Sequence, residues 1–236
     1  MTHYIWRNQI FFICNPRLGD HRSLQECLCE RAYDNLLDKC HFSSNQITYV
    51  NIGANIGAFD LLLIDRNLFV ETGLAVELNP FTYLRCLLNF QTNQLTSVQL
   101  VNAGLAGVNG SLKFQPSANS RSDSIFAATS MSKNSGVEVE LLTLETLLDK
   151  YSNRSIEFDL LKLDCEGAEY GVIRFSSIDV LRRFRHIIVE FHPEPENESV
   201  EAAYDKLKQA GFNSMRMQPG KFLYTDLFTR IENSRA

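Results

Sequence analysis

The segment Tyr49–Gly57 constrains the fold more than any other part of this chain. An apolar run over residues 47–52 ends in a Gly-x-Asn-x-Gly turn, after which apolar residues resume at once. This order predicts a buried strand, a tight turn and the start of a helix. A second apolar run, Leu74–Leu78, carries an acidic residue, Glu77, near its end. Open α/β sheets bind adenosine-containing cofactors with this combination of glycine turn and acid.

Composition and charge exclude several classes of protein. The chain has 236 residues, of which 44% are hydrophobic and 22% charged, so a substantial core is available. A formal net charge of −5 argues against binding nucleic acid, because phosphate backbones require a clustered excess of Lys and Arg. Residues 1–12 lack the pattern of a secretion signal, and no run predicts a membrane span. We therefore expect a cytoplasmic protein with free thiols.

Strand and helix patterns alternate along the chain. This alternation predicts a doubly wound, mostly parallel seven-stranded sheet with a C-terminal antiparallel hairpin. Residues 47–236 are expected to form this one domain, with residues 1–46 packed on it as an extension. The further predicted elements are a strand or lid over 5–13, a helix over 23–40 capped by Ser23, strands over 97–103, 137–142, 158–163 and 186–191, helices over 81–88, 144–150 and 200–207, and hairpins at Asn109-Gly110 and Pro219-Gly220.

The glycine turn and Glu77 fit a nucleoside without phosphates. Gly53 and Gly57 permit a sharp turn and close approach of a ligand, although a plain turn between strand and helix is the alternative. The Glu77 carboxylate can accept hydrogen bonds from both ribose hydroxyls. Asp60 occupies the place of the third glycine in the dinucleotide pattern. A pyrophosphate therefore fits poorly, which disfavours a nicotinamide-dependent oxidoreductase.

A second group of polar residues follows later strands. Asp164 and Glu166 come after the strand over 158–163, and His192 comes after the strand over 186–191. We expect all three at the crevice where cofactors bind, with His192 as a general base that Asp164 and Glu166 orient. Simpler roles are a helix cap, a helix-dipole partner and a structural histidine. Alternatively, Asp164, Glu190 and His192 could hold a divalent cation, but a metal is not our prediction.

These segments resemble a known family. Residues 50–57, 76–80, 161–169 and 189–192 are similar to the FkbM family of S-adenosylmethionine-dependent methyltransferases, over about residues 47–195. The most specific part is Asp164–Glu169. The resemblance implies a class I methyltransferase fold and methylation of an oxygen on a sugar, a glycolipid or a natural product. S-adenosyl-L-homocysteine would be the second product. Neither the identity of the acceptor nor the oligomeric state follows from the sequence.

The resemblance also implies cofactor contacts. The glycine turn would line the methionine part, Glu77 would hold the ribose, and Asn102 and Ala103 would lie near the adenine. The expected cofactor-binding residues are Asn51, Gly53, Asn55, Gly57, Glu77, Leu78, Asn102, Ala103 and Asp164.

Asn51 departs from the family pattern, because it stands where the family usually has Asp. The change removes a negative charge near a cationic cofactor, a Coulomb term of roughly 1–4 kcal/mol. The chain could thus be a catalytically silent binding or scaffold protein, and restoring Asp at position 51 would then strengthen cofactor binding. Acceptor binding is expected from the Ser- and Asn-rich residues 117–135 and from the N-terminal residues.

Overall fold

A seven-stranded, mostly parallel sheet forms the centre of the protein. The computed structural model describes residues 1–7, 10–115, 123–126, 136–196, 198–219 and 224–231. The strand order is β11-β12-β10-β9-β3-β4-β5, and β12 runs antiparallel to both of its neighbours. This confirms the predicted sheet and its terminal hairpin. The strands are β3 (Gln46–Ile52), β4 (Phe69–Glu77), β5 (Val98–Asn102), β9 (Phe158–Leu163), β10 (Phe184–Phe191), β11 (Phe212–Pro219) and β12 (Tyr224–Arg230).

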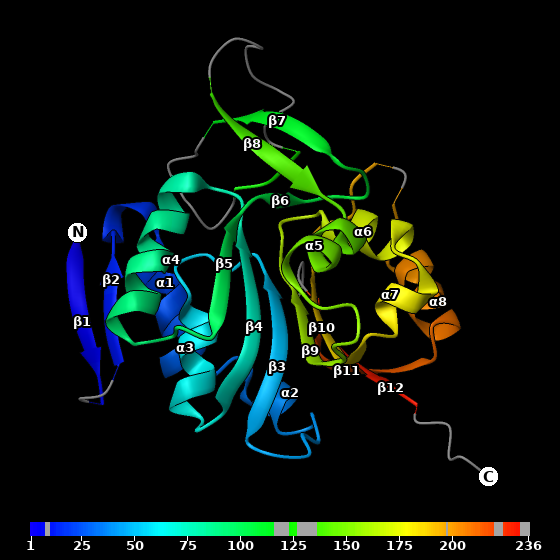
Figure 1. The fold of residues 1–236 in the computed structure, drawn as a ribbon, viewed down its shortest axis with the longest axis horizontal. Helices are drawn as coiled ribbons and strands as arrows, with labels where there is room; N and C mark the ends of the chain where they lie inside the picture. The colour runs from blue at the N-terminus through cyan, green and yellow to red at the C-terminus, as the bar shows by residue number, and fades with distance from the viewer. Residues whose placement is uncertain (8–9, 116–122, 127–135, 197, 220–223, 232–236) are drawn as a thin grey trace.

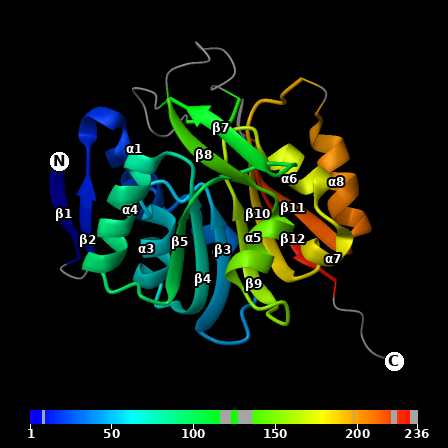
Figure 2. The same cartoon turned by 45° about the horizontal axis from the view of Figure 1, so that its top comes forward.

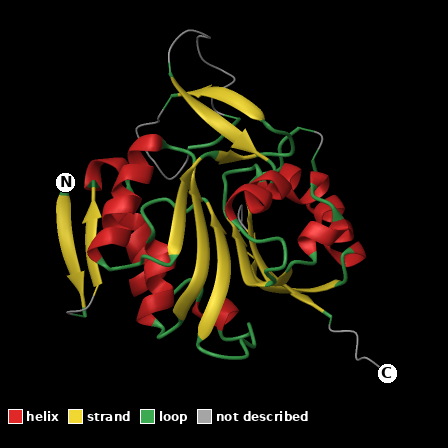
Figure 3. Ribbon diagram, in the orientation of Figure 1, coloured by secondary structure: helices red, strands yellow, loops and turns green. Residues whose placement is uncertain are grey.

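Helices cover both faces of this sheet (Figures 1 and 3). One face carries α1 (Asp20–Leu24), α3 (Ala58–Asp65) and α4 (Pro80–Thr92). The other face carries α5 (Leu144–Tyr151), α6 (Glu169–Phe175), α7 (Ile178–Leu181) and α8 (Val200–Gln209). Neighbouring strand residues point to opposite faces, so Tyr49 belongs to one apolar core and Val50 to the other. Burial on both faces explains why the strands read as continuous apolar runs.

The N-terminal residues form a hairpin of β1 (Thr2–Trp6) and β2 (Ile10–Cys14), which lies beside α4 (Figure 1). The strand predicted over 5–13 is therefore part of a two-stranded sheet. Two amide side chains hold it: the Ile13 N–H donates to Asn89 of α4, and the Phe11 N–H donates to Asn93, the residue that follows α4. A short 3-10 helix (Pro16–Leu18) leads from this hairpin to α1.

The helix predicted over 23–40 is wrong as a single element. The structure has α1, a π-helical turn (Gln25–Cys29) and α2 (Asp34–Leu37). Arg31 breaks the run, since its φ is +58° and its guanidinium pairs with Asp34 and Asp65. Ser23 lies inside α1 and does not cap it; its hydroxyl donates to Asn55 instead. This break brings the segment around Ser23 to the glycine turn.

A small sheet lies at the carboxyl ends of the large sheet's parallel strands (Figure 2). Its order is β6 (Gly104–Leu105), β8 (Val137–Leu142), β7 (Gly110–Phe114), so the predicted hairpin at Asn109-Gly110 is wrong. Asn109 instead accepts a hydrogen bond from the Thr143 N–H and donates one to the Thr146 hydroxyl, just before and within α5. Of residues 117–135, the structure describes only 123–126, and the rest of that expectation lies outside the described residues.

The remaining helices and the C-terminal strands follow the predicted pattern. Gly211, with φ +90°, lies between α8 and β11, and β11 pairs with β12. Gly220 of the predicted turn lies outside the described residues. Among the helices that the structure describes, none is long and apolar enough to span a bilayer.

Candidate active site

A cavity of about 390 Å³ opens where β3, β4, β9 and β10 end. Its volume is in the range of small-molecule sites. Most of the residues expected to act together line it, whereas Asn51, Gly57 and Asn102 lie outside the lining that the described residues form. The expected residues that do line it are Gly53, Asn55, Glu77, Leu78, Ala103, Asp164, Glu166 and His192.

Close packing against β9 requires the glycine at position 53. Gly53 has φ +77°, and a Cβ there would lie 1.7 Å from the carbonyl oxygen of Asp164. The N–H groups of Gly53 and Ala54 both donate to the carbonyl of Val76, at 3.0 and 2.9 Å. The turn is thus fixed between the ends of β9 and β4, and only glycine fits.

Gly57 contributes to helix packing, which corrects its expected role. A Cβ on Gly57 would lie 2.7 Å from the ring of Phe90 in α4, and its φ is +85°. The residue therefore lets α3 begin close to α4 and does not contact the cavity. The glycine pattern and the family resemblance had assigned both glycines to the ligand.

Glu77 is a buried carboxylate at the cavity wall, with 5% of its surface exposed. Its two oxygens accept hydrogen bonds from backbone N–H groups, Oε2 from Asn55 at 2.8 Å and Oε1 from Asn79 at 2.9 Å. Burial raises the pKa of Glu77 to about 7, and the two hydrogen bonds oppose this shift. The carboxylate is therefore held in one orientation beside the glycine turn. Each of its oxygens has a further lone pair for a ligand hydroxyl.

Asn102 supports the cavity from behind. Its side-chain N–H group donates to the carbonyls of Glu77 and Leu78, at 2.8 and 3.1 Å. It thus fixes the backbone of Leu78, which lines the cavity together with Ala103. The expected contact of Asn102 with the cofactor is replaced by this supporting role.

Asn51 is fully buried below the cavity, in a different setting from the one expected. Its Nδ2 donates to Asp60 at 2.8 Å, and the Tyr49 hydroxyl donates to the same carboxylate at 2.6 Å. Burial raises the pKa of Asp60, and these two hydrogen bonds oppose the shift. An ionised aspartate at position 51 has no proton to donate, so Asp60 explains why this chain has Asn there.

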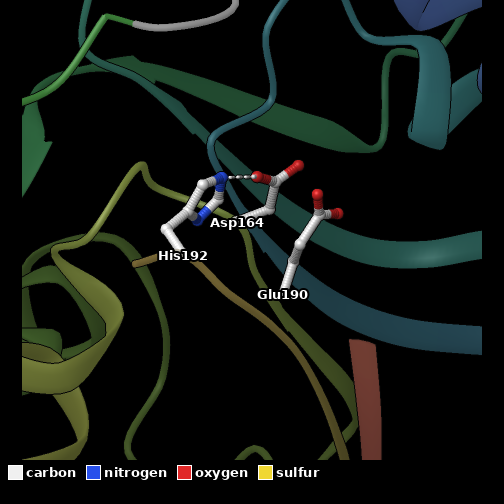
Figure 4. A group of neighbouring side chains, drawn as sticks. All are labelled: Asp164, Glu190 and His192. Atoms are coloured by element: carbon white, nitrogen blue, oxygen red, sulfur yellow. Dashed lines mark ion pairs between the residues drawn. The ribbon is translucent and has the colours of Figure 1, made fainter. Parts of the chain in front are cut away.

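Asp164, Glu190 and His192 meet on the opposite wall (Figure 4). The Nε2 atom of His192 lies 3.8 Å from Oδ1 of Asp164 and 3.5 Å from Oε2 of Glu166. One ligand atom from each of Asp164, Glu190 and His192 lies within 4.8 Å of the others. The simpler role of Asp164 as a helix cap is wrong, because α6 begins at Glu169 after Ala168.

Glu169 was not among the expected site residues, yet it supports His192. It is fully buried, and its Oε1 accepts from the His192 N–H at 2.8 Å and lies 3.2 Å from Nδ1 of the same residue. Its Oε2 accepts from the Gly167 N–H at 3.0 Å. Glu169 therefore fixes the His192 ring and points Nε2 toward Asp164. Glu169 ends the segment Asp164–Glu169, the part of the sequence most specific to the family, and this position could have indicated a role in the site.

The carboxylates around His192 change its expected chemistry. Burial alone would lower the pKa of this imidazole, but Glu166 and Glu169, with Asp164 adding, raise it to about 11. At neutral pH the ring in this arrangement is therefore an imidazolium, which donates hydrogen bonds and has no lone pair for a proton. This arrangement argues against the expected role of His192 as the general base and favours a role as a hydrogen-bond donor.

Lys162 and Tyr33 complete this wall, and neither was identified from the sequence. Lys162 is 2% exposed, and its Nζ lies 2.9 Å from Oδ2 of Asp164 and 5.7 Å from the centre of the Tyr33 ring. The Tyr33 hydroxyl donates to Oε2 of Glu190 at 3.1 Å. Asp164, followed by burial, raises the pKa of Glu190. A lysine inside a buried strand requires a carboxylate partner. The position of Lys162 in an apolar run could therefore have indicated a charged site beside it.

Negative charge dominates the cavity. Two cationic groups, Lys162 and His192, face a larger set of carboxyl groups. A cavity with this balance favours a ligand or ion that carries positive charge. The carboxyl groups in the lining are those of Glu26, Glu77, Asp123, Asp164, Glu166 and Glu190.

Comparison with known families identifies a match over most of the chain. The model of the methyltransferase FkbM domain matches residues 51–214. This range contains the glycine turn, Glu77 and the Asp164–His192 wall. A comparison with curated proteins found no match.

Solved structures share the fold at low sequence identity. A methyltransferase FkbM from Methylobacillus flagellatus KT has a TM-score of 0.56 at 12% identity, over 92% of this chain and 56% of that chain. The METTL16 methyltransferase domain has a TM-score of 0.55 at 13% identity, over 97% and 86%. A human methyltransferase 10 domain containing protein has a TM-score of 0.50 at 13% identity, over 85% and 80%. These neighbours are class I methyltransferases, so they share the fold expected from the sequence.

Proposed function

The chain belongs to the FkbM methyltransferase family, whose methyl donor is S-adenosylmethionine, and from this we propose that it methylates a hydroxyl of a sugar, glycolipid or natural-product acceptor. The observation that carries the proposal is the single cavity that Gly53, Asn55 and Glu77 share with Asp164 and His192. One cavity can therefore take both a donor and an acceptor.

The residues of the β3–β4 wall fit the donor. Glu77 presents fixed carboxylate oxygens suited to two ribose hydroxyls, and Gly53 lets the backbone come close without a side chain. The excess of carboxyl groups in the cavity suits a ligand with a sulfonium and an ammonium group. Asp164, next to the glycine turn, is proposed to face the methionine part.

The residues of the β9–β10 wall are proposed to hold the acceptor. When bound, the donor supplies a methyl group that leaves sulfur as the acceptor oxygen attacks, which gives an ether and S-adenosyl-L-homocysteine. Asp164 and Glu166 would orient the acceptor hydroxyl and receive its proton. His192 would place positive charge at Nε2, beside the attacking oxygen. Positioning of both reactants in one cavity supplies most of the acceleration.

Two other functions lose support. The silent scaffold rested on the charge missing at Asn51, but Asn51 is a hydrogen-bond donor to the buried Asp60 and lies outside the described cavity lining. A nicotinamide cofactor requires close approach of a pyrophosphate where Asp60 stands, and that carboxylate is fully buried.

Binding and turnover test the proposal separately. We expect S-adenosyl-L-homocysteine to bind in isothermal titration calorimetry and NAD not to compete with it. Incubation with S-adenosylmethionine carrying a labelled methyl group and a panel of hydroxylated acceptors should label one acceptor class. Absence of S-adenosyl-L-homocysteine binding contradicts the donor site. Binding with label transferred only to nitrogen or carbon contradicts O-methylation.

A further inference from the structure

Three potential metal ligands converge beside the proposed methyl-transfer site. Asp164 directly follows β9, Glu190 lies within β10, and His192 directly follows β10. Their ligand atoms lie within 4.8 Å of one another, close enough to contact one ion after small side-chain rotations. Figure 4 shows the His192 ring and the Asp164 carboxylate pointing toward each other, with the Glu190 carboxylate beside them.

The supporting contacts resemble those around metal ligands. A metal-binding histidine generally uses one ring nitrogen for the ion and donates the other N–H to a carboxylate. Glu169, which is fully buried, lies 3.2 Å from Nδ1 of His192 and therefore leaves Nε2 to face the cavity. The His192 side chain is itself 9% exposed, so its orientation is fixed by packing.

Both carboxylates are also anchored through one oxygen. Lys162 holds Asp164 through Oδ2 at 2.9 Å, while Oδ1 is the oxygen that faces His192. Tyr33 holds Glu190 through Oε2 at 3.1 Å. Each side chain can thus present a second oxygen without losing its anchor. Such preorganisation separates this group from an ordinary acidic patch.

The excess of carboxyl groups near the three residues favours a divalent cation. Near the three residues, Glu166 and Glu169 add two further carboxyl groups, and Lys162 is the cationic side chain among the described neighbours. A divalent ion bound between the three residues would offset part of this negative charge.

We propose that Asp164, Glu190 and His192 form a site for a divalent first-row metal ion that also binds the acceptor oxygen. Mixed imidazole and carboxylate ligands favour ions such as Mn²⁺, Fe²⁺ or Zn²⁺ over Ca²⁺. Three protein ligands leave coordination positions open to the acceptor and water. The position assigned to the acceptor rests on the proposed function, whereas metal binding does not.

Binding of Mn²⁺ to the chelator-treated chain tests the site. Electron paramagnetic resonance should show loss of the free-ion signal with one bound ion per chain. Echo-modulation spectra of the bound ion should show one imidazole nitrogen. We expect His192→Gln and Glu190→Gln to weaken binding by about tenfold or more. The matched controls, His41→Gln and Glu140→Gln, change an exposed histidine and an exposed carboxylate and should bind as the unaltered chain does.

The outcomes separate this site from the proposed function. No Mn²⁺ binding, no nitrogen coupling in the unaltered chain, or equal losses in the control variants would overturn the metal site. The nitrogen measurement needs no variant, so it decides the question even where a substitution prevents folding. Titration with S-adenosyl-L-homocysteine without metal tests the donor site independently. Loss of that binding, with Mn²⁺ binding retained, contradicts the proposed function alone.

Discussion

The two walls of the cavity are built differently. The β3–β4 wall is built from a glycine turn and one carboxylate, Glu77, both held in place by backbone N–H groups. The β9–β10 wall consists of charged side chains that hold one another, with Lys162 and Glu169 as anchors. The first wall depends on backbone shape and the second on charge balance. On the first wall, a substitution should therefore act through one buried or fixed polar group, whereas on the second wall it should act through several charges at once.

Asn51→Asp should have the largest effect, because it adds charge below the backbone-built wall. Two carboxylates would then share a buried site, since Asn51 Nδ2 now lies 2.8 Å from Asp60. We expect a loss of about 3–5 kcal/mol in the free energy of unfolding, measured by urea denaturation. The swapped double variant, Asn51→Asp with Asp60→Asn, restores one donor and one acceptor and should recover much of it. Unchanged stability of the single variant would contradict this account.

Glu77→Ala should have the next largest effect, now on cofactor binding. The substitution removes the acceptor for two backbone N–H groups and the proposed ribose contact. We expect S-adenosyl-L-homocysteine to bind about 100-fold more weakly in calorimetry, as the loss of charged hydrogen bonds implies. Glu71→Ala, an exposed glutamate on the same strand, is the matched control and should bind normally. Equal losses in both variants would exclude a specific role for Glu77.

The pH dependence of cofactor binding should be smaller and has a defined sign. Ionised Glu77 accepts ribose hydrogen bonds, and its pKa is raised to about 7. The affinity for the cofactor should fall by up to about tenfold for each pH unit below 7, and Glu77→Gln should flatten this dependence.

The stability of the folded chain depends on pH with the opposite sign, because the folded state holds the Glu77 proton more tightly than the unfolded chain does. The stability contributed by protonated Glu77 is therefore lost as pH rises from about 4.5 to about 7. Affinity that is constant over this range would contradict the assignment.

The reactivity of Cys165 should show the smallest effect and reports on the charged wall. Burial, followed by Glu169 and Asp164, raises the pKa of this thiol well above its ordinary value. We expect alkylation by iodoacetamide at pH 8 to be at least about tenfold slower than that of the exposed Cys29. Peptide mass spectrometry distinguishes the two thiols. Equal rates would mean that the negative charge near Cys165 is screened.

The sequence was sufficient for the sheet and for the location of the site. Continuous apolar runs predicted the strands, and parallel strands bring Glu77, Asp164 and His192 to one edge whatever the loops do. The helix over 23–40 failed because apolar spacing does not reveal that Arg31 adopts a positive φ to reach two acids. The Asn109 turn failed because β8, distant in sequence, pairs with both neighbouring strands.

The charged wall was less predictable for a physical reason. Residue type indicated that Asp164, Glu166 and His192 carry chemistry, but not which of them holds a proton. That property depends on burial and on neighbours such as Glu169, which was not among the expected site residues. For Asn51, the partner nine positions later, Asp60, decides its role, and that contact exists only after the strand and helix have packed.

Because Gly53 has no side chain, the glycine turn of the first wall packs directly against the backbone of Asp164 in the second wall. With the Asp164 carbonyl filling the space that a Cβ would need, any movement of the glycine turn is transmitted to the end of β9. The proposed donor end and the proposed acceptor end of the cavity are therefore held at one separation. Diversification of acceptor choice would be concentrated in segments outside this contact, such as the stretch over 123–126, whose Asp123 and Ile125 border the cavity.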